Sequence, residues 1–196
     1  LSFAGHPSLG TAWALGPKRW TQRTSGATVV VEADEHGAVM SQPDPVFTET
    51  DPVPAAKALG LNEHEGAWVA RAGGNSHLLV LTDQPIHRLE PNLPAVQRVA
   101  ELAMTFTVAV VERRHDHTLH VRVFVPGGGI PEDPGTGSAA GPIGLLASEH
   151  WGTDVDVTVL QGAEVGRPCV IQVHAERGAL TVGGRVAQCA KGHFLL

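Results

Sequence analysis

Residues 127–141, GGGIPEDPGTGSAAG, lie between an apolar run typical of a strand, residues 121–125, and a run of small residues predicted to be helical, residues 138–150. The glycines of this segment allow the backbone to take positive φ and to approach a ligand closely. The free N–H groups at the start of a helix present partial positive charge to an anion. A strand, a glycine turn and the start of a helix therefore coincide, which favours a site for an anion such as a substrate carboxylate.

Two polar residues of this turn, Asp133 and Ser138, are candidates for the chemistry. If both side chains face the same ligand site, Asp133 would accept a proton and Ser138 would donate a hydrogen bond. Alternatively, both residues only cap the turn and the helix. Nucleotide-binding patterns fit poorly, because the lysine of a phosphate-binding loop is missing and the glycines do not follow the dinucleotide spacing. A serine-hydrolase elbow would need glycine where Thr136 and Ala140 stand.

A second helix start, Gly5-His6-Pro7-Ser8, opens another Ala/Gly-rich stretch, residues 8–15. The positive end of a helix favours a neutral imidazole, which can donate or accept a proton near pH 7. His6 is therefore a candidate acid/base residue, unless it only caps or packs. Each helix start is followed by a glycine-turned hairpin, residues 29–39 and 171–180. This repeated pattern predicts two similar lobes that face each other. Alternatively, the two hairpins resemble each other by chance.

Short runs rich in Val, Leu, Ile and Thr, separated by glycine and proline, predict strands over much of the chain. Strands are expected at residues 27–33, 38–42, 68–72, 77–81, 105–112, 119–124, 156–160, 170–174 and 179–182. Helices are expected at residues 8–15, 93–102 and 138–150. The chain should therefore combine many strands with a few helices.

The composition is that of a soluble globular protein, with 42% hydrophobic and 17% charged residues among 196. This length fits one domain or two small lobes. The formal net charge is −6 and the basic residues do not cluster, so we expect no nucleic-acid partner. No apolar run is long enough for a bilayer crossing, and we expect no membrane association and a cytoplasmic location. Cys169 and Cys189 are too few for a disulfide framework and are expected to be packed thiols.

A histidine cluster, His115, Asp116, His117 and His120, has residue types that bind metals. It lies between two strand-like runs, where a polar turn is expected, and no separate pair of ligands stands out. We therefore expect no metal site.

Several motifs together resemble the phenazine-biosynthesis PhzF-like isomerase family. They run through nearly the whole chain: SFAGHPSLGTA at residues 2–12, MSQP at 40–43, GNSHL at 74–78, RVF at 122–124, GIPEDPGTGSA at 129–139 and QGAEVGRP at 161–168. The resemblance implies an α+β fold like that of diaminopimelate epimerase, with two pseudo-symmetric lobes, each a curved sheet around a central helix, and the active site between them. On that basis, residues 1–105 would be the remainder of a first lobe that lacks its amino-terminal strands. Residues 106–196 would be the second lobe, with the last strand able to return to the first.

The resemblance also implies a cofactor-independent isomerase, commonly a homodimer, that moves a proton on a small carboxylated substrate of the dihydro-hydroxyanthranilate type. His6 and Asp133 match positions that handle the proton, and Gly5, Gly137 and Ser138 match positions around the substrate carboxylate. Neither a metal nor a coenzyme is implied. Racemisation by two thiols is not expected, because the cysteine pair of related epimerases is absent from the matching positions.

One part of the family pattern does not match. The principal acid/base of the family is a glutamate upstream of the Gly-His-Pro motif, whereas this chain starts at Leu1, directly before that motif. Glu49, within Thr48-Glu49-Thr50, lies downstream and does not match in order. Two hypotheses follow: the amino-terminal part of a longer gene product is missing, or the protein is a non-catalytic relative that binds small carboxylates.

Overall fold

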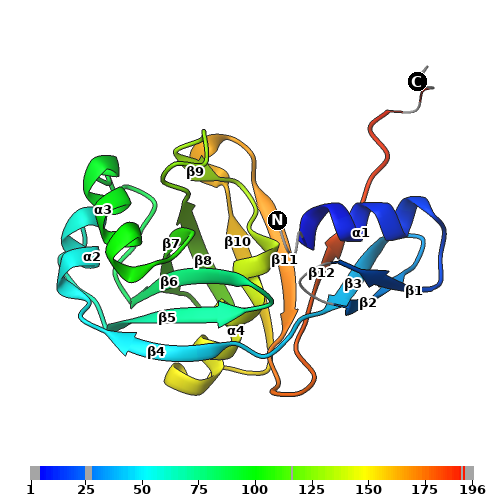
Figure 1. The fold of residues 1–196 in the computed structure, drawn as a ribbon, viewed down its shortest axis with the longest axis horizontal. Helices are drawn as coiled ribbons and strands as arrows, with labels where there is room; N and C mark the ends of the chain where they lie inside the picture. The colour runs from blue at the N-terminus through cyan, green and yellow to red at the C-terminus, as the bar shows by residue number, and fades with distance from the viewer. Residues whose placement is uncertain (1–4, 25–27, 116, 191, 193–196) are drawn as a thin grey trace.

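A computed structural model describes residues 5–24, 28–115, 117–190 and 192 and shows an α+β fold built on one mixed sheet (Figure 1). The helices are α1 (Gly5–Ala14), α2 (Val53–Leu59), α3 (Leu93–Ala103) and α4 (Gly137–Trp151), with a 3-10 turn η1 (Ala163–Val165). The strands are β1 (Arg19–Arg23), β2 (Thr28–Ala33), β3 (Gly37–Ser41), β4 (Val46–Thr50), β5 (Gly66–Ala72), β6 (Asn75–Thr82), β7 (Thr107–Arg113), β8 (Thr118–Phe124), β9 (Glu132–Asp133), β10 (Asp156–Gln161), β11 (Cys169–His174) and β12 (Thr181–Arg185). Neighbouring strands follow the order β1-β2-β3-β12-β11-β10-β8-β7-β6-β5-β4, and β9 pairs with β8.

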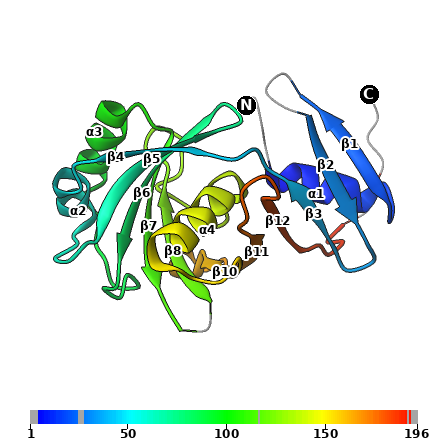
Figure 2. The same cartoon turned by 90° about the horizontal axis from the view of Figure 1, so that it is seen from below.

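In the larger part of the molecule, a curved run of strands surrounds α4 (Figure 2). This helix is made of small and apolar residues, and residues 139–147 are all buried. Its glycines allow the strands to come close: a Cβ on Gly144 would lie 2.8 Å from Cγ1 of Val173 and 3.0 Å from Cγ2 of Val157. A helix that is apolar on all sides is stable only when it is enclosed, which is the environment that this sheet supplies.

The outer face of the same strands is covered by α2 and α3 (Figure 1). Along β6, Leu79 and Leu81 join the inner core around α4, whereas Leu78 and Val80 join the outer core beneath α2 and α3. Alternate residues of a strand face opposite sides, so a strand that is covered on both faces has a continuous apolar run. The apolar run of β6 has this cause.

In the smaller part of the molecule, α1 packs on the β2–β3 hairpin. The strand β12 pairs with β3 on one side and with β11 on the other, and thus joins the two parts. The helix α1 buries only Gly5, Ser8 and Ala12. Although α1 is as rich in small residues as α4, it is therefore covered on one side, whereas α4 is enclosed.

Strand pairing continues without a break across residue 105, where a boundary between lobes was expected. The strands β6 and β7 are parallel neighbours, with Leu79 opposite Ala109, and α3 is the crossover between them. The segments β4 to β6, assigned from sequence to the first lobe, thus pair in series with β7 and β8. We propose that the division lies instead near residue 42, after β3, with β12 returning to the first part.

The nine expected strands and three expected helices are all present, with shifted ends. The helix α1 starts at Gly5, before Ser8, and β12 is displaced toward the carboxyl end of its expected range. The strands β1, β4 and β9 and the helix α2 were not predicted. Prolines at the start of α2 obscured its pattern, although proline suits the first turn of a helix. Within the described residues, no helix is long and apolar enough to cross a membrane.

Candidate active site

The amino end of α1 faces the larger part of the molecule and meets the amino end of α4 (Figure 1). A Cβ placed on Gly5 would lie 3.7 Å from the carbonyl carbon of Gly137, and one placed on Gly137 would lie 3.8 Å from the nitrogen of His6. The Cβ on Gly5 would also lie 2.6 Å from Cε of Met40, so glycine is needed for this close approach. Two helix starts, with their partial positive charges, therefore converge on one place.

His6 lies exposed in the first turn of α1. Its Nδ1 is 3.3 Å from the carbonyl oxygen of Gly135, to which Nδ1–H can donate. In that tautomer, Nε2 is a proton acceptor.

Asp133 is half-buried in β9, which pairs with β8. Its Oδ2 accepts a 2.7 Å hydrogen bond from Oγ1 of Thr136, and its Oδ1 lies 3.5 Å from the backbone nitrogen of Gly135. His6 and Asp133 thus contact the same residue, one at its carbonyl and the other at its N–H. The geometry brings the two predicted acid/base residues to one site, and their roles remain a prediction.

A buried ion pair orients the strand that carries Asp133. Arg122 donates from Nε to Oε1 of Glu132 at 3.0 Å and from Nη2 to Oε2 at 2.8 Å. The Nη1 group of Arg122 also donates to the carbonyl oxygens of Ile86 and Leu89. Because consecutive side chains of a strand face opposite ways, fixing Glu132 on one side directs Asp133 to the other. The sequence signal for this pair is a charged residue, Arg122, within the otherwise apolar run of residues 121–125.

Two glutamines that sequence analysis did not select hold the backbone of the site. Gln161 accepts from the backbone nitrogen of Thr136 at 3.1 Å and donates from Nε2 to the carbonyl oxygen of Asp133 at 2.6 Å. Gln42 donates from Nε2 to the carbonyl oxygen of Gly137 at 2.8 Å. Both glutamines occur in the quoted family motifs, but only the fold shows that they meet the glycine turn.

Cys169 also lies at this site, at the start of β11. A Cβ on Gly135 would lie 2.9 Å from its Sγ and 3.4 Å from Cε1 of His6. Burial raises the pKa of the Cys169 thiol above its ordinary value, and the negative charge of Asp133 raises it further. The thiol therefore stays protonated at neutral pH and is a poor base. Cys189 was expected to be packed, but this prediction was wrong: it is exposed on the segment after β12, where no strand partner covers it.

Ser138 follows Gly137 in the first turn of α4, where the buried His77 interacts with its backbone. Burial lowers the pKa of His77 to about 4, so the ring is neutral at physiological pH. The Nδ1 of His77 lies 2.8 Å from Oγ1 of Thr107. Ser138 is partly exposed and stands beside Gly137, as a substrate-binding role requires.

Two hollows flank His6. One has a volume of about 250 Å³ and is mostly apolar, and its lining includes Leu9, Gly137, Cys169 and Val182. The other has a volume of about 340 Å³ and is lined by His6, Pro134, Gly135, Arg167, Pro168 and Cys169. Arg167 adds a positive charge to the partial charges of the helix starts. The site can therefore hold a small anion next to acid/base groups.

The histidine cluster does not converge. His115 and His117 lie exposed in the β7–β8 turn, Asp116 lies outside the described residues, and His120 is buried between Glu112 and Glu164. Across the described ranges, no group of three or more His, Cys, Asp or Glu residues is arranged to hold a metal ion.

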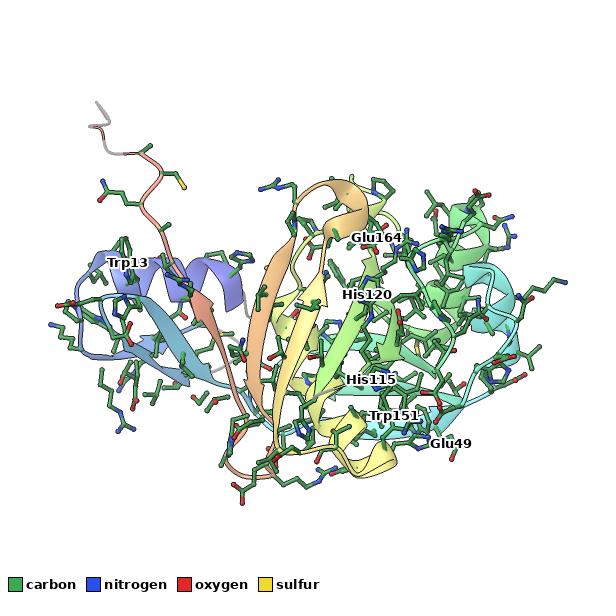
Figure 3. The ribbon with its side chains drawn as sticks, turned by 180° about the vertical axis from the view of Figure 1, so that it is seen from behind. Trp13, Glu49, His115, His120, Trp151 and Glu164 are labelled. Carbon is green, nitrogen blue, oxygen red and sulfur yellow. The ribbon has the colours of Figure 1, made fainter. Side chains whose placement is uncertain are left out.

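Glu49 lies on the edge strand β4, opposite Trp68 of β5. The ring of Trp68 packs against that of His150, next to Trp151 at the carboxyl end of α4 (Figure 3). The candidate site is at the opposite end of that helix. Glu49 therefore cannot replace the upstream glutamate of the family.

Comparison with known proteins gives a consistent result. A family model described as phenazine biosynthesis-like protein, PhzC-PhzF, matches residues 1–192. The trans-2,3-dihydro-3-hydroxyanthranilate isomerase of Pseudomonas chlororaphis is 32% identical over 190 residues, which cover 90% of this chain and 66% of the relative. The isomerase of the same name from Pseudomonas aeruginosa is 32% identical over 217 residues, which cover 100% of this chain and 76% of the relative. The chain thus spans about two thirds to three quarters of the length of these relatives.

Solved structures share the fold. A predicted epimerase from Pseudomonas aeruginosa aligns with a TM-score of 0.80 and 26% identity, covering 100% of this chain and 76% of its own. A PhzF-family protein of Bacillus anthracis aligns with a TM-score of 0.73 and 20% identity, covering 93% of this chain and 72% of its own. The α+β, epimerase-like fold expected from the resemblance is therefore confirmed, and the chain belongs to the PhzC-PhzF family of phenazine biosynthesis-like proteins.

Proposed function

We propose that this protein is an isomerase that moves a proton on a small carboxylated metabolite, without metal or coenzyme. The observation that carries the proposal is the convergence of His6 and Asp133 on Gly135, beside the two helix starts. Relatives that are 32% identical are named trans-2,3-dihydro-3-hydroxyanthranilate isomerases, which supports a substrate of that type.

The site has the parts that such a reaction needs. The backbone N–H groups near Gly5 and Gly137, with the Ser138 hydroxyl, would hold the substrate carboxylate. Removal of a proton next to a conjugated system and its return elsewhere needs acid/base groups at both ends of the shift. Asp133 and His6 would serve as these groups, Asp133 as the half-buried carboxylate and His6 as the exposed imidazole. The protonated Cys169 would line the cavity without acting as the base.

A second hypothesis is a protein that binds small carboxylates without turning them over. It is supported by the two helix starts and by Arg167, which would hold a carboxylate whether or not turnover follows. This hypothesis predicts the same ligand but no proton exchange.

The test is deuterium incorporation into trans-2,3-dihydro-3-hydroxyanthranilate in D2O, followed by proton NMR, with binding measured in parallel by calorimetry. The wild-type protein should exchange the substrate, and Asp133→Asn should lower the rate by about 10²-fold or more, the scale of general acid/base catalysis. Asp154→Asn is the matched control, because the Asp154 carboxylate is exposed and accepts from the N–H of the adjacent Val155. Binding without exchange would support the second hypothesis, and neither binding nor exchange would contradict both.

A further inference from the structure

A buried charge cluster lies outside the candidate site, on the strands next to it (Figure 3). The side chains of His120 on β8, Glu112 on β7 and Glu164 on η1 are only 6%, 9% and 11% exposed. Arg114, directly after β7, contacts both Glu112 and His120 and is 40% exposed. Groups this polar are rarely buried without a specific arrangement.

The imidazole of His120 bridges two carboxylates. Its Nδ1 lies 2.9 Å from Oε2 of Glu112, and its Nε2 lies 2.8 Å from Oε1 of Glu164. Glu112 has further donors, because Arg114 Nε lies 3.0 Å from Oε1 and the backbone nitrogen of Ile86 lies 3.1 Å from Oε2. Glu164 is held differently, since its Oε2 is buried and makes no hydrogen bond within the part of the chain that the structure describes. Its contact with His120 is therefore the polar link between the η1 turn and the sheet.

The η1 turn is a closed unit that includes part of the wall of the candidate site. The N–H of Arg167 donates to the carbonyl of Gly162 at 2.9 Å, which closes the turn on itself. A Cβ on Gly162 would lie 2.5 Å from the carbonyl oxygen of Pro134, so the turn packs directly on the backbone that precedes Gly135. Gln161, which donates to the Asp133 carbonyl, leads into the turn, and Cys169 follows it.

We propose that His120 and Glu164 form a clamp that positions the η1 turn, and through it Gln161, Asp133 and Cys169, for the reaction. They are positioning residues, since neither lines the two hollows beside His6. The catalytic part of this inference rests on the proposed function, whereas the structural part can be tested without any substrate.

The physical reason for a polar clamp is directional. A buried polar pair contributes little net stability over an apolar pair of the same shape, because desolvation offsets the attraction. A hydrogen bond at 2.8 Å, however, fixes the distance and angle of its two groups more narrowly than an apolar contact does. Loss of the Glu164 carboxylate should therefore loosen the turn more than it lowers global stability.

The Cys169 thiol serves as the reporter in the first experiment. In a Cys189→Ser background, Cys169 is the remaining cysteine, and its alkylation by iodoacetamide is slowed by burial and by the charge of Asp133. Glu164→Ala should raise the alkylation rate about tenfold, because the net contribution of one hydrogen bond corresponds to about that factor in an opening equilibrium. Glu164→Gln keeps a carbonyl oxygen that can accept from Nε2–H of His120, and it should stay within about twofold of the parent rate if that bond is the link.

The matched control is Glu149→Ala, which removes a glutamate from its exposed pair with Arg177 near the other end of α4 and should leave the rate unchanged. An unchanged rate in Glu164→Ala would overturn the clamp. If Glu164→Ala does not fold, hydrogen exchange of the wild-type protein decides: the N–H of Arg167 should be protected like those of β10, and exchange at the unprotected rate would overturn the proposal.

The second experiment measures the effect on turnover with trans-2,3-dihydro-3-hydroxyanthranilate. Glu164→Ala should lower kcat more than it changes KM, and Glu164→Gln should restore most of kcat. Equal kcat in all three proteins would overturn the catalytic part of the inference. If the wild-type protein shows no turnover, the proposed function fails, and the alkylation rates still decide whether the clamp exists.

Discussion

Substitution of Arg122 by methionine tests whether the buried pair next to Asp133 holds the site together. The side chains of Arg122 and Glu132 are 8% and 7% exposed, and the guanidinium also donates to two backbone carbonyls. Arg122→Met leaves the Glu132 carboxylate buried without its counter-ion. Removal of one partner from a buried pair costs about 3 to 5 kcal/mol. This is a large part of the roughly 5 to 15 kcal/mol by which domains are stable.

The assay is urea unfolding followed by tryptophan fluorescence, since the chain has four tryptophans. With a urea dependence of about 2 kcal/mol per molar, the midpoint should fall by roughly 1.5 to 2.5 M. The double variant Arg122→Met/Glu132→Leu should regain most of this loss, because no charge is then left buried. Arg177→Met is the control, because it breaks an exposed pair with Glu149 and should cost less than about 1 kcal/mol. A loss as small as the control's in Arg122→Met would refute the reasoning.

Two further predictions concern pH and packing. The pKa of His77 is lowered from 6.5 to about 4 in the folded protein, so the unfolded chain binds the proton first as the pH falls. Relative to His77→Gln, the wild-type protein should therefore lose about 3 kcal/mol of stability between pH 6.5 and pH 4. Urea unfolding at each pH measures this loss, and parallel profiles of stability against pH in the two proteins would contradict it. Gly10→Ala in α1, where a Cβ meets no atom within 4 Å, should raise stability by about 0.5 to 1 kcal/mol. Gly141→Ala in α4 should lower it, because the Cβ would lie 2.1 Å from Oε1 of Gln42. Thermal unfolding checks this pair of variants. A gain of stability in both would show that helix propensity outweighs packing at Gly141.

The sequence by itself determined the local structure and the two helix starts of the candidate site. Apolar runs predicted β6 and β7, and the glycine turn before Ser138 predicted the start of α4. The spacing of apolar residues, the turn residues and the residues at a helix start are all features of neighbouring positions in the chain. The quoted motifs also sufficed to indicate the family. The α2 helix was missed because prolines in its first turn look like a loop when read without their surroundings.

Only the tertiary structure decided which distant residues meet. Sequence spacing could not show that His6 and Asp133 both contact Gly135, that Cys169 lies beside them, or that His120 binds Glu164. The lobe boundary expected at residue 105 involves the same kind of contact, since it would separate β6 from β7, which pair through the α3 crossover. Local patterns are set by bonds along the chain, whereas these contacts depend on strand order and register, which the folding of the whole sheet decides.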